Sequence, residues 1–164
     1  MNKVKFRYAT EADAALVLEF IKGIAIYENM LDEVINTEEM IKEVVFGKGH
    51  AEVIFALEDE KEVGFALFFH NYSTFVGRAG IHLEDLFVWP EYRGKGYGKA
   101  LLTEVTRIAK ERNCGRVEWT CLDWNQPSID FYLSKGAVPM DEWTIYRLTA
   151  DKIDELVKRN EEDV

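Results

Sequence analysis

The sequence predicts an α/β or α+β fold built on a mixed sheet. Segments with alternating apolar residues, typical of strands, interchange with segments whose apolar residues repeat at helical spacing. Strands and helices follow one another in mixed order, which favours this class. The chain of 164 residues, 48% hydrophobic and 30% charged, fits one domain, residues 1–164, with a substantial core.

The first third of the chain predicts one strand and two helices. Residues 4–9 alternate as in a strand. Thr10 offers an N-cap with Asp13 three residues later, and apolar residues then repeat at helical spacing as far as Tyr27. A second helix is expected to begin after Thr37 and to end at Gly47.

The rest of the chain predicts strands and helices in turn, separated by charged or glycine-containing links. The expected elements are strands at 51–57 and 63–69 joined by a hairpin turn at 58–61, a strand at 81–88, a helix at 98–112, a strand at 116–121, a helix at 127–135, a strand at 143–148 and a terminal helix at 151–159.

Composition narrows the class of partner. The formal net charge of −10 argues against nucleic acid as the main partner. It suits a cationic small molecule, although solubility alone also explains it. No apolar run is long enough to span a membrane, and no signal peptide is evident, so a cytoplasmic location without membrane attachment is expected. Cys114 and Cys121 are expected to be free thiols, and the three histidines lack the spacing of metal ligands, so no metal is expected.

A glycine-rich turn stands between the strand at 81–88 and the helix at 98–112. It reads Arg93-Gly94-Lys95-Gly96-Tyr97-Gly98-Lys99. Its alternate glycines let the main chain turn tightly and keep Cβ atoms away from a ligand. Main-chain N–H groups at a helix N-terminus favour an anion, and three basic side chains reinforce this preference. The turn therefore predicts a site for a phosphate or diphosphate.

Two common phosphate-binding loops do not fit this spacing. The dinucleotide fingerprint G-x-G-x-x-G needs its third glycine one residue later than Gly98. The Walker loop needs one more residue between Gly94 and Gly98, and a hydroxyl where Ala100 stands. A plain glycine turn with solvated lysines is the remaining alternative, but the charge and the position before a helix favour phosphate binding.

The turn resembles the coenzyme A diphosphate loop of the GNAT acetyltransferase superfamily, which has the form Q/R-x-x-G-x-G/A. The block Asn125-Gln126-Pro127-Ser128-Ile129-Asp130-Phe131-Tyr132 resembles the second cofactor-contact region of that superfamily. The segments at 82–88 (HLEDLFV) and 124–132 (WNQPSIDFY) are most similar to the diamine (spermidine/spermine) N-acetyltransferase group. This resemblance covers about residues 6–148 and is weakest near Glu142, where the chain is shorter than those relatives.

The resemblance implies a GNAT fold, in which a mixed, mostly antiparallel twisted sheet carries helices on both faces. It also implies acetyl-CoA as cosubstrate and, because relatives of this type are usually homodimers, a homodimer. The cofactor-binding residues that it implies are Leu86, Phe87, Val88, Arg93, Gly94, Lys95, Gly96, Tyr97, Gly98, Lys99, Asn125, Gln126, Pro127 and Ser128. Capping of the helix that Pro127 starts is a second role open to Asn125.

Two residues are candidates for catalysis. An amine must be neutral to attack a thioester, and with a pKa near 10.4 only about one molecule in 10³ is neutral at pH 7. By resemblance Glu84 is the base or the amine-binding carboxylate, the alternative being an exposed strand residue. Tyr132 can donate a proton to the departing thiolate; core packing is its alternative, and the match of the surrounding block favours catalysis. Asp85 is expected to be structural.

The resemblance also nominates the acceptor site, where carboxylates spaced along a groove would pair with separated ammonium groups. The residues are Tyr27, Glu28, Glu84, Glu118, Trp119, Thr120 and Glu142. Glu118 and Trp119 replace other residue types found in the relatives, so the preferred length and charge of the acceptor are expected to differ.

The apolar pattern of the strand at 81–88 changes phase. Ile81 and Leu83 have one parity, whereas Leu86 and Val88 have the other. A β-bulge near residues 84–86 explains the change and would free main-chain N–H groups to polarise the acetyl carbonyl. A strand buried on both faces is the alternative, because Phe87 keeps the first parity.

The expected activity is direct acetyl transfer to a primary amine of a diamine, polyamine or lysine-like small molecule. Acetylation of a protein lysine, a protein N-terminus or an aminoglycoside keeps the fold and changes the acceptor. A coenzyme A-binding sensor is the non-enzymatic alternative, but such a sensor needs neither Glu84 nor Tyr132.

Overall fold

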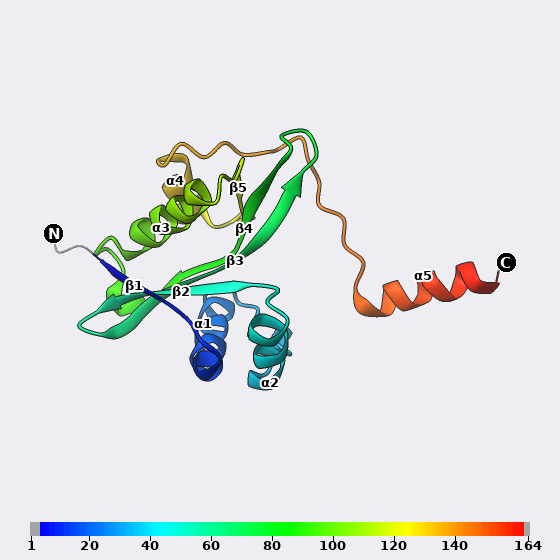
Figure 1. Ribbon diagram of the computed structural model, residues 1–164, viewed down its shortest axis with the longest axis horizontal. Helices are drawn as coiled ribbons and strands as arrows, with labels where there is room; N and C mark the ends of the chain where they lie inside the picture. Colours follow the sequence, from blue (N-terminus) through cyan, green and yellow to red (C-terminus); the bar gives the residue numbers. More distant parts are fainter. Residues whose placement is uncertain (1–3, 163–164) are drawn as a thin grey trace. The chain divides into compact units, whose positions relative to one another are not determined.

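A computed structural model describes residues 4–162 and divides the chain into two compact units, Met1–Thr120 and Cys121–Val164 (Figure 1). The first unit carries the whole sheet, in the order β1-β2-β3-β4-β5. Its strands are β1 (Lys5–Tyr8), β2 (Glu52–Glu58), β3 (Lys61–Ser73), β4 (Arg78–Val88) and β5 (Val117–Glu118). The pairs β1–β2, β2–β3 and β3–β4 are antiparallel, and β5 is parallel to β4. This confirms the mixed, mostly antiparallel sheet.

The pairing of β3 with β4 contains one irregularity that matters for function. Leu67 pairs with Asp85, whereas the next residue, Phe68, pairs with Leu83. Glu84 is therefore an extra residue in β4, and the strand carries a β-bulge there. This confirms the β-bulge near residues 84–86 that the change of phase in the sequence predicts.

Helices cover both faces of the sheet in the first unit. Figure 1 shows α1 (Ala14–Tyr27) and α2 (Glu38–Ile41) on one face and α3 (Tyr97–Glu111) on the other. The short helices η1 (Glu11–Asp13), η2 (Leu31–Glu33) and η4 (Pro90–Tyr92) lie in the links. The last turns before Gly47 form a π-helix, η3 (Lys42–Gly47), rather than a continuation of α2.

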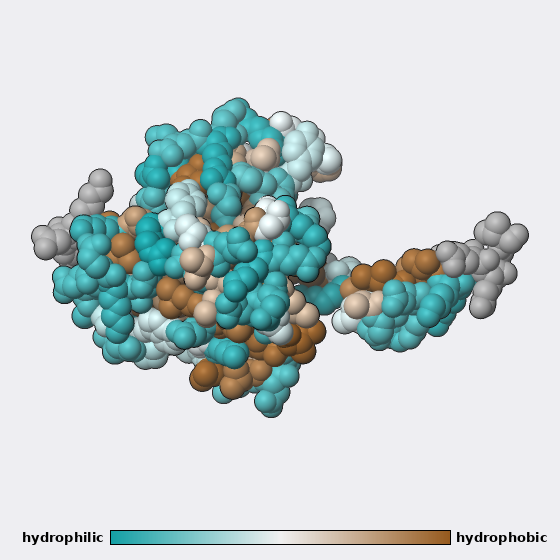
Figure 2. Space-filling model, turned by 60° about the horizontal axis from the view of Figure 1, so that its bottom comes forward, coloured by the Kyte–Doolittle hydropathy of each residue, from teal (hydrophilic) through white to brown (hydrophobic). Residues whose placement is uncertain are grey.

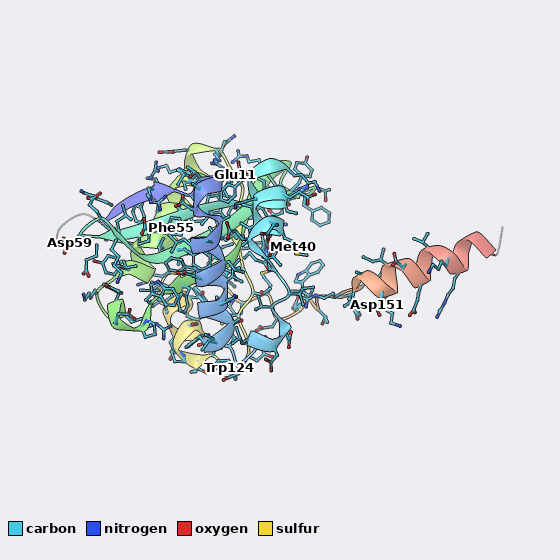
Figure 3. All side chains as sticks on the ribbon, turned by 90° about the horizontal axis from the view of Figure 1, so that it is seen from below. Glu11, Met40, Phe55, Asp59, Trp124 and Asp151 are labelled. Carbon is cyan, nitrogen blue, oxygen red and sulfur yellow. The ribbon has the colours of Figure 1, made fainter. Side chains whose placement is uncertain are left out.

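Aromatic rings form the core between α1 and the sheet. Phe20 of α1 is fully buried, and its ring stacks on Phe65 with centroids 5.0 Å apart. Trp89, directly after β4, packs on Phe20 at 4.9 Å and meets Phe87 edge-on at 5.1 Å. Figure 3 shows Phe55 of β2 beneath α1. This packing fixes the end of β4, from which the glycine-rich turn departs.

The opposite face of the sheet is covered by the apolar side of α3. The buried residues of this helix are Leu101, Leu102, Val105, Ile108 and Ala109. Their spacing of three and four residues places them on one side of the helix, as the sequence predicts. The helix begins at Tyr97, within the glycine-rich turn, so packing of α3 also holds that turn in place.

The second unit contains α4 (Gln126–Leu133) and α5 (Ala150–Glu162). Both helices were expected, with ends that differ from the structure by at most three residues. Figure 2 shows an apolar strip along α5, to which the exposed Ile153, Leu156 and Val157 belong. Pro127 stands in the first turn of α4, a position that proline favours because its missing N–H is not needed there.

Two expectations about strands were wrong. Residues 143–148 do not form a strand: no described strand gives them a hydrogen-bonded partner, and Trp143, Ile145, Tyr146 and Leu148 are exposed. A strand was also expected at 116–121, but only Val117 and Glu118 pair with β4. Because the bulge at Glu84 bends β4, the parallel ladder ends at His82, just before it.

Candidate active site

The turn before α3 has the conformation that its glycines predict. Gly94 and Gly96 adopt φ angles of 77° and 91°, in the left-handed region that residues with a Cβ seldom enter. A Cβ added at either glycine would meet no atom within 4 Å, so the space beside the turn is open. Gly96 is the N-cap of α3 without a side-chain cap, and the N–H groups of the first turn have no intrahelical acceptors. This arrangement fits a phosphate ligand.

The three basic side chains of the turn have different surroundings. The Arg93 guanidinium lies 4.9 Å from the centroid of the Tyr27 ring, and its Nε donates to the carbonyl oxygen of Val88 at 3.0 Å. Lys95 Nζ donates to Glu58 Oε1 at 3.0 Å. Lys99 is exposed and makes no ion pair within residues 4–162. The turn therefore presents cations at its start, middle and end.

The strand that leads into the turn has an unpaired edge. β5 pairs with β4 only at Ile81 and His82, and no other described strand pairs with that side of β4. In an antiparallel strand, alternate N–H groups point to either side. From the bulge to Val88, those pointing away from β3 consequently have no strand partner among the described residues. Leu86 is half-buried, and Phe87 and Val88 are buried.

The bulge determines how Glu84 is presented. As the extra residue of β4, Glu84 has no partner on β3, and its side chain is 56% exposed. Its Oε2 lies 3.4 Å from His82 Nε2, two residues earlier on the same side of the strand. An exposed carboxylate with an imidazole beside it can accept a proton, directly or through water.

Asp85 is the carboxyl group most altered by the fold. Burial raises the pKa of Asp85 from 3.8 to about 7, and the charges of Glu84 and Glu28 raise it further. Asp85 pairs with the buried Leu67 in the sheet, and its carboxyl group makes no hydrogen bond or ion pair with the described residues 4–162. The sequence predicted a structural role, but a buried carboxyl with a raised pKa beside an exposed one is typical of a functional site.

The end of α1 belongs to the same cluster of carboxyl groups. Glu28 follows the last residue of α1 and is half-buried, and burial raises its pKa. The structure thus brings Tyr27, Glu28, Glu84 and Asp85 together from two elements, with the Arg93 guanidinium over the Tyr27 ring. The negative charges of this cluster favour a cationic ligand.

The residues nominated near β5 are engaged differently. Glu118 Oε1 accepts from Arg116 Nε at 2.7 Å and from Asn71 Nδ2 at 3.1 Å. Trp119 and Thr120 lie beyond the end of β5. The expectation of a strand that carries all three side chains was wrong, because only Glu118 lies in it.

The other nominated residues lie in the second unit. Asn125 is the N-cap of α4: its side-chain oxygen accepts from the N–H of Ser128 at 3.4 Å. Gln126 Nε2 donates to Asp130 Oδ1 at 2.7 Å. Tyr132 is half-buried, with its ring 5.4 Å from that of Phe131, and Glu142 is exposed. The capping role left open for Asn125 is therefore confirmed.

Residues 4–162 contain neither a membrane-spanning helix nor a cluster of metal ligands. No helix there is both long enough and apolar enough to cross a bilayer. No group of three or more histidine, cysteine or acidic side chains in the same range is arranged to hold a metal ion.

The structure thus combines an open, basic glycine-rich turn at the start of a helix, an unpaired strand edge and a cluster of carboxyl groups. The chain belongs to the acetyltransferase (GNAT) family, whose pattern matches residues 23–137. Members of this family use acetyl-CoA as cosubstrate, so the protein is an acetyl-CoA-dependent N-acetyltransferase.

Two curated relatives are similar to this chain. The thialysine N-epsilon-acetyltransferase of Bos taurus is 33% identical over 168 residues, which cover 95% of this chain and 98% of that protein. The L-ornithine N5-acetyltransferase NATA1 of Arabidopsis thaliana is 44% identical over 104 residues, or 63% of this chain and 46% of that protein. The match thus spans about half the length of the plant enzyme and nearly the whole bovine one.

One solved structure is similar over nearly the whole chain. It is the integron cassette protein VCH_CASS6 from the mobile metagenome of V. cholerae, with a TM-score of 0.79 and 28% identity, covering 96% of this chain and 99% of that one. This likeness agrees with the family and with the open mixed sheet.

Sequence reasoning missed two participants in this region. From the sequence, His82 was considered only as a metal ligand, although its separation of two from Glu84 is the signal that places both on one side of a strand. Glu58, at the end of β2, binds Lys95 of the glycine-rich turn. No signal in the sequence indicates that contact, because it joins residues far apart in the chain.

Proposed function

We propose that this enzyme acetylates a primary amine of a small cationic acceptor, namely a diamine, a polyamine or a lysine-like molecule, in a ternary complex. The observation that carries the proposal is the β-bulge, which presents Glu84 beside Asp85 and Glu28. The net charge of −10 favours the approach of such cations. The names of the relatives, an ornithine and a thialysine acetyltransferase, agree with this acceptor class.

Glu84 is proposed to accept the proton of the attacking ammonium group, directly or through one water. Asp85 and Glu28 supply negative charge that holds the cationic acceptor, together with the ring of Tyr27. Glu118, Trp119, Thr120 and Glu142 are proposed to contact the more distant parts of the acceptor. The ion pair of Glu118 with Arg116 weakens its own attraction for an ammonium group.

Acetyl-CoA supplies the activated acetyl thioester. Free N–H groups of β4 near the bulge are proposed to donate to the acetyl oxygen, where negative charge develops during transfer. The Tyr132 hydroxyl is proposed to deliver the proton that the departing sulfur needs. The ammonium group thereby loses one proton to Glu84, and the neutral amine forms a C–N bond to the acetyl carbon. The C–S bond then breaks, coenzyme A leaves as a thiol with the Tyr132 proton, and the second proton lost by the nitrogen returns to the Tyr132 oxygen, directly or through water.

The cofactor is proposed to bind along two segments. Leu86, Phe87 and Val88 offer main-chain groups to the pantetheine arm, and residues 93–99 bind the diphosphate. By resemblance to the family alone, Asn125, Gln126, Pro127 and Ser128 are also proposed as cofactor contacts. The family match crosses the boundary at residue 120, which supports the proposal that residues 1–164 form one acetyltransferase domain.

The proposal also covers the setting of the enzyme. We place it in the cytoplasm as a homodimer, without nucleic acid, membrane or metal as a partner. The exposed apolar side chains of residues 143–148 and of α5 supply surface that an interface would bury.

The test is release of free thiol from acetyl-CoA in the presence of a panel of amines. We expect release with spermidine, putrescine, ornithine or thialysine, and none without an amine. Release of thiol only with peptides or aminoglycosides would contradict the proposed class of small cationic acceptors. Binding of coenzyme A without any release would indicate a sensor.

A further inference from the structure

The turn between β2 and β3 lies against the glycine-rich turn. Figure 3 labels Asp59 at its tip. Asp59 and Glu60 both have positive φ angles, 48° and 64°, as a two-residue hairpin turn requires. Glu58 and Lys61 pair directly before and after them, so Glu58 is held by the end of the ladder.

The Glu58 carboxylate contacts two residues of the glycine-rich turn. Its Oε1 accepts from Lys95 Nζ at 3.0 Å and from the Tyr97 hydroxyl at 2.8 Å, and Oε2 lies 3.3 Å from Lys95 Nζ. The bond to Lys95 and then that to Tyr97 lower the pKa of Glu58, so the group is an anion at neutral pH. The bonds to Lys95 and Tyr97, together with the pairing of Glu58 with Lys61 in the sheet, hold this carboxylate in position.

Lys95 is the more exposed member of the pair. Its side chain is 49% exposed, against 29% for Glu58, and it extends from a turn whose flanking glycines have open space beside them. An ion pair this exposed contributes little to stability. A diphosphate in the open space would therefore be able to draw the Lys95 ammonium away from Glu58.

We propose that Glu58 sets the affinity of the turn for coenzyme A by competing with the diphosphate for Lys95. This inference rests on the proposed binding of coenzyme A at residues 93–99. Glu58 acts twice against the ligand: it occupies the Lys95 ammonium, and it places a negative charge beside the bound phosphates. A weaker hold on coenzyme A favours its release after the acetyl group has left.

The test is a double-mutant cycle, with coenzyme A binding measured by titration calorimetry. Glu58→Gln keeps an acceptor for Tyr97 but removes the charge, and we expect its Kd to fall about two- to fivefold, the range of an exposed ion pair. Lys95→Met weakens binding. In that background, Glu58→Gln is expected to have at most a small residual effect, because the competition has been removed.

Glu60→Gln is the matched control. It removes the same charge from the same turn, but Glu60 pairs with Lys5 at 2.6 Å and does not contact residues 93–99. We expect its Kd for coenzyme A to match that of the wild type. The gain of Glu58→Gln should also shrink at 0.5 M salt, since ions screen exposed charges on the order of 3–5 Å apart and beyond.

Three results would overturn the inference. These are equal gains for Glu58→Gln and Glu60→Gln, an undiminished gain when Lys95 is Met, or weaker binding by Glu58→Gln. Absence of coenzyme A binding by the wild-type protein is a different failure: it removes the proposed cofactor site itself, and the cycle then has nothing to compare.

Discussion

The Tyr132 hydroxyl is the smallest feature on which the proposed chemistry depends. Tyr132→Phe removes only an oxygen from a half-buried ring on α4. We expect kcat to fall about 10²-fold or more, as loss of a general acid does. The Kd for coenzyme A should stay within about twofold, because the ring still packs.

Tyr146→Phe is the control for that substitution. It makes the same change in the same unit on a side chain that is 92% exposed. We expect normal turnover. Unchanged turnover in Tyr132→Phe would remove the hydroxyl from the chemistry, whereas equal losses in both variants would indicate a general effect on the unit.

Asp85 predicts a dependence of stability on pH. Burial raises its pKa from 3.8 to about 7, so the folded state holds the proton more tightly than the unfolded state. The favourable contribution is complete below pH 4 and is lost as pH rises to 7. Asp85→Asn removes this loss and should therefore be more stable than the wild type at pH 8, by up to about 4 kcal/mol.

Urea unfolding at pH 5 and pH 8 measures this effect. The stability gained by Asp85→Asn should be larger at pH 8. Asp32→Asn, which removes one exposed charge, is the control. A gain that is the same at both pH values would show that the Asp85 carboxyl is not perturbed by the fold. If Asp85 helps to hold the acceptor, its variant should also raise KM for the amine.

The perturbation of Asp85 could not be read from the sequence. Residues 84 and 85 are two adjacent acids, and the alternation of side chains along a strand predicts that they point to opposite faces of the sheet. Which of them is buried depends on the register with β3 and on the end of α1, where Glu28 lies. Neither the register of β3 with β4 nor the position of Glu28 near Asp85 can be inferred from the residues around position 85.

At the scale of elements, the glycine-rich turn offers the sharpest test. Gly96→Ala places a Cβ at a φ angle of 91°, which is strained by about 1–2 kcal/mol, although nothing within 4 Å obstructs it. The Cβ would occupy space proposed for the diphosphate. We expect both lower stability and a Kd for coenzyme A that is about tenfold higher or more, the loss of one charge-assisted hydrogen bond.

Gly77→Ala separates strain from binding. Gly77 has a φ angle of 69° and is equally open, but it lies in the turn between β3 and β4. We expect comparable destabilisation with unchanged coenzyme A affinity. Weaker binding in both variants to the same degree would attribute the effect to stability alone.

Most elements were predictable because their signals are local. The bulge was visible as a change of parity between Leu83 and Leu86, and α3 as an amphipathic repeat after glycines. The strand expected at 143–148 is absent from the structure. Alternating apolar residues indicate which side chains a strand would bury, but they do not show whether a neighbouring strand is present to pair with it.

At the scale of the whole molecule, the charge of −10 predicts how acceptors approach. Screening should weaken the attraction of a trivalent cation more than that of a divalent one. We expect KM for spermidine to rise more steeply than KM for putrescine between about 20 and 200 mM salt, where the Debye length falls from roughly 20 to 7 Å. Equal slopes would mean that the net charge serves solubility alone.

The bulge in β4 has a consequence for how the sheet could be altered. If residue 84 were deleted, Leu83 would still pair with Phe68 and Asp85 with Leu67, and every side chain would keep its face. The ladder would simply become continuous. We expect such a shortened protein to fold with undiminished stability and to bind coenzyme A while failing to acetylate amines. The pairing of β3 with β4 does not require a residue at position 84; only the proposed reaction does.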